Sequence, residues 1–307
     1  MNLLIGVFKK NALAFFSKLI CLGIERSIYL LIQSFKIQKN HFMCGRYILV
    51  QKPELLEKRF NATFLDKEAY APSYNIAPGQ MAAVITDKLP HKIQLFRFGL
   101  TPFWAEKQMT LINARTEGDH NKDNSPLYSG IKGIISKPAF RKPIRSQRCL
   151  VLADAFIEGT EKNGLDEPYV VYVQGIKPFA FAGIWDEWRN PKTDEIIHSF
   201  AIITTTANDL LLKIPHHRSP VILTQYQETK WLRERTSLSG VTQMLQTYPT
   251  EAMNAYPISK EIKALKNNAL NFIQPIGERL QSETEVQIKK TIQLHGMGMY
   301  KDKKRDN

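Results

Sequence analysis

Short segments rich in β-branched and aromatic residues recur along this chain of 307 residues, and no regular alternation of strand and helix separates them. Such segments favour β-strands, and strands without crossover helices between them pair mainly in antiparallel order. The strand candidates are Arg46–Val50, Ala82–Thr86, Ile93–Phe98, Cys149–Phe156, Pro168–Val173, Phe179–Trp185 and Ser199–Thr205. Helices are expected at Lys52–Phe60, Thr224–Glu234 and Gly240–Leu245, and polar loops at Tyr70–Gly79, Asn113–Gly133 and Arg141–Gln147. The sequence therefore predicts an α+β fold, with a curved, mainly antiparallel, barrel-like sheet and peripheral helices.

The first 42 residues differ from the rest in their pattern of apolar residues, because charged residues interrupt the apolar runs. The longest uncharged run, Ser27–Phe35, is far shorter than the ~20 apolar residues that span a bilayer. We interpret residues 1–42 as upstream sequence or a removed leader before a true start at Met43, and an interfacial amphipathic helix is the alternative. Residues 43–284 then form a single domain, and residues 285–307 form a basic, flexible tail.

The chain carries a net charge of +13. Residues 1–42 contribute six Lys and Arg against one Glu, so an excess of basic residues remains without them. A basic excess suits a polyanionic partner, since each phosphate contact made by Lys or Arg releases counterions. A basic surface with no specific partner explains the charge equally well.

The chain has three cysteines, Cys21, Cys44 and Cys149. This number is small and odd, so the cysteines do not form a disulfide framework. Such a set fits a reducing compartment, where a functional cysteine works as a thiol.

The run Met43–Tyr47 offers a specific chemistry. If Met43 is the initiator or a cleavage point, Cys44 becomes N-terminal and carries a thiol and a free α-amine on adjacent carbons. The α-amine has a reference pKa near 8, so it is partly unprotonated at neutral pH and can attack an aldehyde to form an imine. The thiolate can then close a thiazolidine ring. Taken alone, Cys44 is more typical of a small buried residue at the start of a strand than of a reactive group.

Further motifs follow in order along the chain. They are Tyr74–Gly79, Phe98–Trp104, Asn113–Glu117, Arg148–Glu158 and Pro215–Leu223. Together with Met43–Tyr47 they resemble the SOS-response-associated peptidase (SRAP) family of abasic-site crosslinking proteins, over roughly Met43 to Ile276. The chain departs from the family pattern at Gly159, where the family often has Trp, and at Pro215 and Ser219. The resemblance implies a single SRAP-like domain.

The resemblance also implies a covalent crosslink between Cys44 and the aldehyde of an abasic site in single-stranded DNA, after self-cleavage of the preceding residues. Asn113 would position the thiol and amine, Glu158 would move protons on the amine, and His216 would act as acid/base on the sugar ring oxygen. His217 is the alternative to His216. The implied DNA-binding residues are Arg46, Asn75, Pro78, Trp104, Arg115, Thr205 and Arg218.

The resemblance implies no cofactor and no obligate protein partner, and it places a monomer in the cytoplasm, at the nucleoid during DNA damage. His216 and His217 form no zinc site by sequence, because no Cys or acid stands at ligand spacing. Two other functions stay open. One is an N-terminal-nucleophile amidohydrolase acting on a small amide through Cys44. The other is a non-enzymatic basic module that binds single-stranded DNA or a membrane surface.

Overall fold

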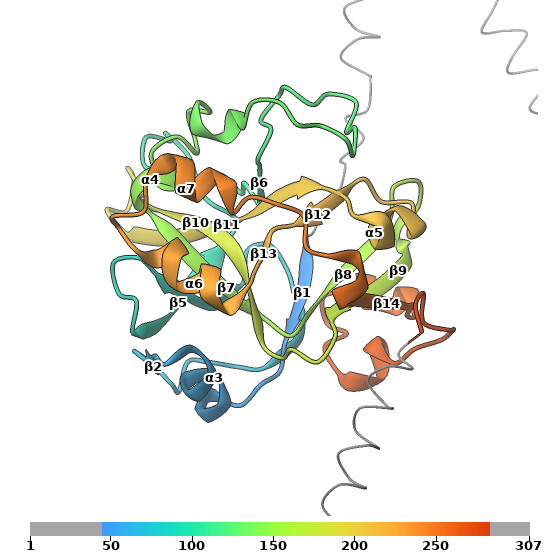
Figure 1. The fold of residues 1–307 in the computed structure, drawn as a ribbon. Coiled ribbons are helices and arrows are strands. Elements are labelled where there is room, and N and C mark those ends of the chain that lie inside the picture. Colours follow the sequence, from blue (N-terminus) through green and yellow to red (C-terminus); the bar gives the residue numbers. More distant parts are fainter. Residues whose placement is uncertain (1–44, 283–307) are drawn as a thin grey trace, which may run out of the picture. The chain divides into compact units, whose positions relative to one another are not determined.

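The computed structural model describes residues 45–282, which form fourteen strands with short helices around them (Figure 1). Cys21, Cys44, the predicted leader and the predicted tail lie outside the described residues, so the domain boundaries stay predictions. The strands are β1 Arg46–Leu49, β2 Thr63–Phe64, β3 Ser73–Ile76, β4 Met81–Thr86, β5 Lys92–Phe98, β6 Asn113–Arg115, β7 Arg148–Ala153, β8 Ala155–Thr160, β9 Gly164–Val173, β10 Phe179–Arg189, β11 Ile196–Thr206, β12 Arg218–Pro220, β13 Ile222–Leu223 and β14 Met253–Pro257.

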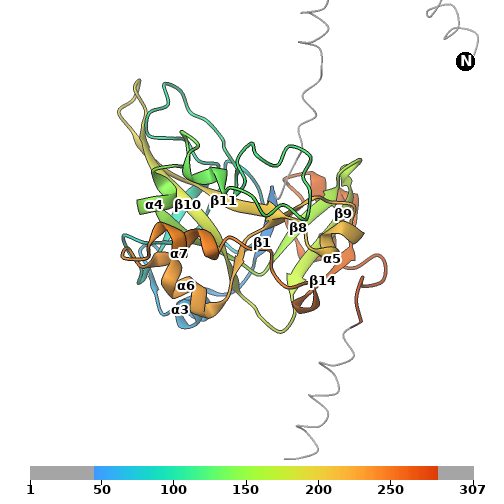
Figure 2. The same cartoon turned by 45° about the horizontal axis from the view of Figure 1, so that its top comes forward.

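The α-helices are α3 Pro53–Phe60, α4 Pro143–Ser146, α5 Asp209–Lys213, α6 Gln225–Leu232 and α7 Leu238–Gln243. Short 3-10 helices are η1 Gly133–Ile135, η2 Thr250–Ala252, η3 Lys260–Lys263 and η4 Leu270–Ile273. The α-helices lie around the outside of the strands, as the turned view also shows (Figure 2). No helix between residues 45 and 282 is long and apolar enough to cross a membrane.

The strands form two sheets. One sheet has five strands in the order β14-β9-β8-β1-β3, and all of its pairs are antiparallel. The other has nine strands, and its path β11-β10-β7-β4-β5 is closed into a ring by a parallel pairing of β5 with β11. The predicted α+β class and the curved, mainly antiparallel, barrel-like sheet are therefore confirmed.

Aromatic rings fill the inner core. Tyr47 on β1 lies edge-on to Phe98 at 5.6 Å and to Phe181 at 5.9 Å between ring centroids, and Phe98 stacks on Phe200 at 5.2 Å. Edge-to-face and offset contacts are the favourable geometries for such rings. A smaller apolar cluster, which includes Ile48, covers the outer face of the five-stranded sheet. Successive residues of β1 thus face different cores, as the alternation of side chains along a strand requires.

The predicted strand Cys149–Phe156 is wrong, because the chain divides there into β7 and β8, which belong to different sheets. Asp154 stands at the break. Its backbone N–H donates to the Ile48 carbonyl at 2.7 Å, and its Oδ2 accepts from the Val50 N–H at 2.7 Å. These bonds to Ile48 of β1 and to Val50 just after it hold the chain where it turns from one sheet to the other.

The predicted polar loops also contain short regular elements. β3 lies within Tyr70–Gly79, β6 and the start of η1 lie within Asn113–Gly133, and α4 lies within Arg141–Gln147. The three predicted helices are present as α3, α6 and α7, with shifted ends.

Candidate active site

Glu158 and His216 meet in the interior. Glu158 lies on β8, and His216 lies between α5 and β12; both are almost fully buried. His216 Nε2 lies 3.5 Å from Glu158 Oε1, and His216 Nδ1 lies 3.0 Å from the Gly159 carbonyl oxygen. A carbonyl only accepts hydrogen bonds, so Nδ1 carries a proton, and Nε2 faces the carboxyl group. The contact between His216 Nε2 and Glu158 Oε1 is therefore the place where this pair can hold or release a proton.

Gly159 makes this arrangement possible. A Cβ at position 159 would lie 2.1 Å from the Gly164 carbonyl oxygen, so no side chain fits there. The β8–β9 register shifts between Gly159 and Thr160, which marks a bulge. On the other side, the His216 N–H donates to the Leu211 carbonyl at 3.0 Å. One backbone carbonyl thus holds the imidazole and another holds the backbone of His216, and the close approach of β9 leaves no room for a side chain at position 159.

His217 lies next to the pair but makes different contacts. Its ring stacks on His216 at 5.4 Å between centroids, and its Nδ1 lies 3.2 Å from Glu161 Oε2. Burial lowers the pKa of His217, against the opposing effect of Glu161. Of the two histidines, His216 is the one that the structure places against Glu158.

Asn113 has unmet hydrogen-bonding capacity. It begins β6, where it pairs in parallel with Ile202 of β11. Both its Oδ1 and its Nδ2 are buried and have no hydrogen-bond partner in the described part of the chain. Buried side-chain amides are rarely without hydrogen-bond partners. The amide of Asn113 therefore fits a role in holding another polar group.

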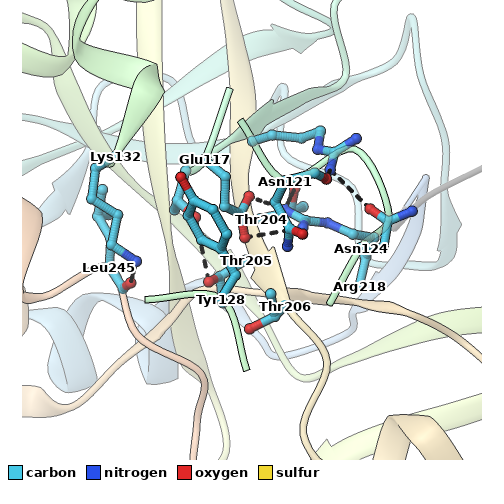
Figure 3. Close-up of polar contacts among 12 residues, drawn as sticks. Glu117, Asn121, Asn124, Tyr128, Lys132, Thr204, Thr205, Thr206, Arg218 and Leu245 are labelled. Carbon is cyan, nitrogen blue, oxygen red and sulfur yellow. Dashed lines mark hydrogen bonds and ion pairs between the residues drawn. The ribbon is translucent and has the colours of Figure 1, made fainter. Parts of the chain in front are cut away.

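Two buried charges occupy the neighbouring region, shown in Figure 3. Arg218 Nη1 and Nη2 donate to Glu117 Oε1 and Oε2 at 3.1 and 2.9 Å, and Arg218 Nη2 also lies 3.3 Å from Thr204 Oγ1. Arg218 has no exposed surface and Glu117 only 1%. Burial alone would raise the pKa of Glu117, but the hydrogen bonds and charge of Arg218 lower it. A direct phosphate contact by Arg218 would require this pair to open.

Arg115 and Thr205 flank the pair. Arg115 Nη2 donates to the Asn121 carbonyl and to Asn124 Oδ1, both at 2.8 Å. Burial and the nearby Arg218 lower the pKa of Arg115. The Thr205 hydroxyl is buried and lies 3.3 Å from that of Thr116. The structure thus brings Arg115, Thr205 and Arg218 together in one region.

Arg46 and Asn75 belong to another part of the molecule. Arg46 Nη1 donates to Asn75 Oδ1 at 2.6 Å, and Asn75 Nδ2 donates to the carbonyls of Ile262, Ala264 and Asn267. Arg46 pairs in β1 with Ile157, so it faces away from Glu158, the next residue of β8. Both side chains anchor the segment around η3, and their contact with DNA stays a prediction.

Trp104 and Pro78 lie on separate loops. The side chain of Trp104 is 49% exposed. In the preceding residue, Phe103, the ring lies under Lys142 Nζ, which is 4.3 Å from the ring centroid. An exposed indole of this kind can stack on an unpaired base. Pro78 is half-buried and precedes Gly79, whose φ of 91° requires glycine.

Two residues of this region, Glu117 and Lys132, are not among the site residues expected from the sequence. Glu117 ends the Asn113–Glu117 motif, so its position was the available signal. Lys132 is half-buried, its Nζ lies 3.4 Å from the Leu245 carbonyl, and burial and Arg218 lower its pKa. No signal in the sequence marked Lys132. Within residues 45–282, no group of three His, Cys, Asp or Glu side chains is arranged to hold a metal ion.

The fold and the site define a class of protein: a mixed α+β domain, part of it a closed ring of strands, with a buried carboxyl–imidazole pair beside β1. The SOS response associated peptidase (SRAP) family model matches residues 43–265. This chain belongs to that family.

Relatives agree with this assignment. The abasic site processing protein YoqW of Bacillus subtilis (strain 168) is 34% identical over 239 residues, which cover 76% of this chain and 99% of that protein. The abasic site processing protein HMCES of Gallus gallus is 25% identical over 71% of this chain and 70% of that protein. A crystal structure of a Bacteroides thetaiotaomicron protein has 29% identity and a TM-score of 0.65, and covers 76% of this chain and all of that one. A Bordetella bronchiseptica structure with 24% identity and a TM-score of 0.57 agrees in fold.

Proposed function

We propose that this protein processes abasic sites in DNA by forming a covalent crosslink to them through Cys44. The family and the relatives named for abasic site processing support this proposal. The observation that carries it is the buried Glu158–His216 pair beside the strand that follows Cys44. β1 pairs with β8 so that Arg46 lies opposite Ile157, and continuing the antiparallel register by one residue brings Gly45 beside Glu158.

The proposed reaction begins when the α-amine of N-terminal Cys44 attacks the aldehyde carbon of the ring-opened sugar. Loss of one water gives an imine, and the thiol sulfur then adds to the imine carbon while its proton passes to the nitrogen. The product is a thiazolidine that joins protein and DNA. Glu158 would accept and return the proton of the amine, and His216 would protonate the ring oxygen as the sugar opens.

Several finer features belong to the same proposal. The substrate strand is single-stranded, the protein acts as a monomer, and residues 1–43 are removed first, because an amide nitrogen at Cys44 cannot form an imine. Cleavage by the protein itself would use the same Glu158 to protonate the leaving amine. Asn113 would hold the Cys44 thiol and amine through its buried amide group.

The test is a crosslinking assay on denaturing gels. Protein beginning at Cys44 is mixed with a single-stranded oligonucleotide that holds one abasic site, and an adduct stable to heat and detergent is expected. Cys44→Ser should abolish the stable adduct, and Glu158→Gln should slow its formation about 100-fold or more. His217→Gln is the matched control for His216→Gln and should slow the reaction much less. Equal crosslinking by Cys44→Ser, or equal loss in both histidine variants, would contradict these roles.

A further inference from the structure

A cavity of about 660 Å³ lies on the outer face of the five-stranded sheet. Ile48 and Ala155, which are paired between β1 and β8, line it, and so do Val170 and Tyr256, which are paired between β9 and β14. Glu158 lies one residue after Ile157 of the outer apolar cluster, so the proposed catalytic pair faces the other side of this sheet. The cavity is therefore separate from the proposed crosslinking site.

The floor of the cavity is apolar and formed by regular structure. Ile48, Ala155 and Val170 are each no more than 4% exposed, and Leu270 and Ile273 of η4 line the cavity as well. The volume lies within the ~300–1,000 Å³ typical of small-molecule sites, which are mostly apolar with a few placed polar groups. Because the floor is held by paired strands, the site exists before any ligand binds.

Two cations gather around one tyrosine in the lining. Lys177 Nζ lies 5.7 Å from the ring centroid of Tyr172, and Arg279 Nε donates to the Tyr172 hydroxyl at 3.0 Å. Lys177 makes no ion pair with any acid in the part of the chain that the structure describes. A lysine and an arginine at one rim suit a ligand anion with several acceptor oxygens, of which phosphate is the usual biological example.

The remaining lining suits a polar aromatic ring. Tyr74, Tyr172 and Tyr256 all line the cavity, and the last two have ring centroids 5.8 Å apart. Asp154, 3% exposed, uses Oδ2 to accept from Val50, and its Oδ1 is buried without a hydrogen-bond partner in residues 45–282. Burial raises the pKa of this carboxyl group, against the opposing effects of Val50, Gln51 and Lys177. An unmet carboxyl oxygen favours a ligand with an N–H group. An alkyl chain would leave that oxygen unmet and would gain only apolar contact from the phenol rings.

We propose that this cavity is a nucleotide-binding site: a nucleobase bearing N–H groups stacks on the tyrosines and meets Asp154, while its phosphate meets Lys177 and Arg279. This site lies beyond the crosslinking function and does not depend on Cys44. The same chemistry fits a free nucleoside monophosphate or the terminal nucleotide of a DNA strand, and the two sources are separated by experiment.

Binding is measured by titration calorimetry on the full chain, with dAMP, a trinucleotide ending in 5′-phosphorylated dA, and decanoate as probes. Saturable binding of dAMP, of the trinucleotide or of both is expected, and the pattern identifies the source. Ala155→Leu, which fills the floor, should abolish binding. Lys177→Gln should weaken it about tenfold, as the loss of one charge-assisted contact predicts. The exposed Lys192→Gln in the β10–β11 hairpin is the matched control and should leave the affinity unchanged.

Thermal unfolding confirms that each variant is folded, and Lys177 is exposed enough for its variant to fold normally. Abasic-site crosslinking by Lys177→Gln should equal that of the parent protein, so failure of the crosslinking function and failure of this site are distinguishable. The proposal is overturned if neither nucleotide probe binds at millimolar concentration, if Ala155→Leu and Lys177→Gln bind as well as the parent, or if decanoate binds this site more tightly than dAMP.

Discussion

Replacing Arg218 by methionine would leave the carboxylate of Glu117 buried without its partner. The two side chains are 0% and 1% exposed and are joined by two hydrogen bonds of 3.1 and 2.9 Å. Methionine fills most of the arginine's volume, so the main change is the loss of charge pairing. Breaking a buried pair from one side costs about 3–5 kcal/mol, since the remaining charge is uncompensated.

That cost is a large part of the ~5–15 kcal/mol by which domains are usually stable. In a domain of this size, where 1 kcal/mol shifts Tm by about 2–4 °C, it corresponds to a fall in Tm of about 6–20 °C. Urea unfolding followed by circular dichroism measures the change. The double variant Glu117→Gln with Arg218→Met should recover at least half of the loss, because the buried negative charge is gone. A loss below about 1 kcal/mol in Arg218→Met, or an additive loss in the double variant, would refute the reasoning.

The same pair gives a pH dependence with a definite sign. Arg218 lowers the pKa of Glu117 in the folded protein below its value in the unfolded chain. The stabilisation from this group is therefore complete above the unfolded pKa, near 4.3, and is lost as pH falls through the folded pKa. The Glu117→Gln variant should lose less stability than the parent protein over that acidic range.

Three further outcomes follow from single positions. Gly159→Ala should destabilise the protein and slow crosslinking, because its Cβ would meet the Gly164 carbonyl and displace the Gly159 carbonyl that holds His216; unchanged crosslinking kinetics would count against this. Tyr47→Phe should be neutral or stabilising by up to about 1 kcal/mol in urea unfolding, because the hydroxyl is buried with no partner in the described residues. Cys149, fully buried and with its pKa raised by burial, should react with a thiol reagent only after unfolding, and mass spectrometry of native and denatured samples checks this.

Local patterns were sufficient to predict the fold class and most strands, because β-branched runs and helix signals act over a few residues. They failed at Cys149–Phe156, where the residues read as one continuous strand. The break at Asp154 depends on its bonds to Ile48 and Val50, which lie far away in the sequence. A turn fixed by a distant strand leaves little trace in its own composition.

The candidate site shows the same limit. The motif residues Glu158 and His216 do meet, as a shared role would require. Arg218 was expected at a DNA phosphate, yet its surroundings are set by Glu117, which is 101 positions away. An arginine in a motif has the same appearance in sequence whether it reaches solvent or a buried acid. Only the pairing of β11 with both β6 and β12 decides between them.

The position of β1 in its sheet affects the order of folding. This first described strand lies in the interior of the sheet, between β8 and β3, and β8 is made much later than β1 during synthesis. In a nascent chain, β1 therefore lacks one of its two neighbours until β8 has been synthesised. Contacts between distant segments form slowly because a long loop must close first. The contacts of β1 with β8 thus assemble only when most of the domain exists, and an incomplete chain would lack the Glu158–His216 pair.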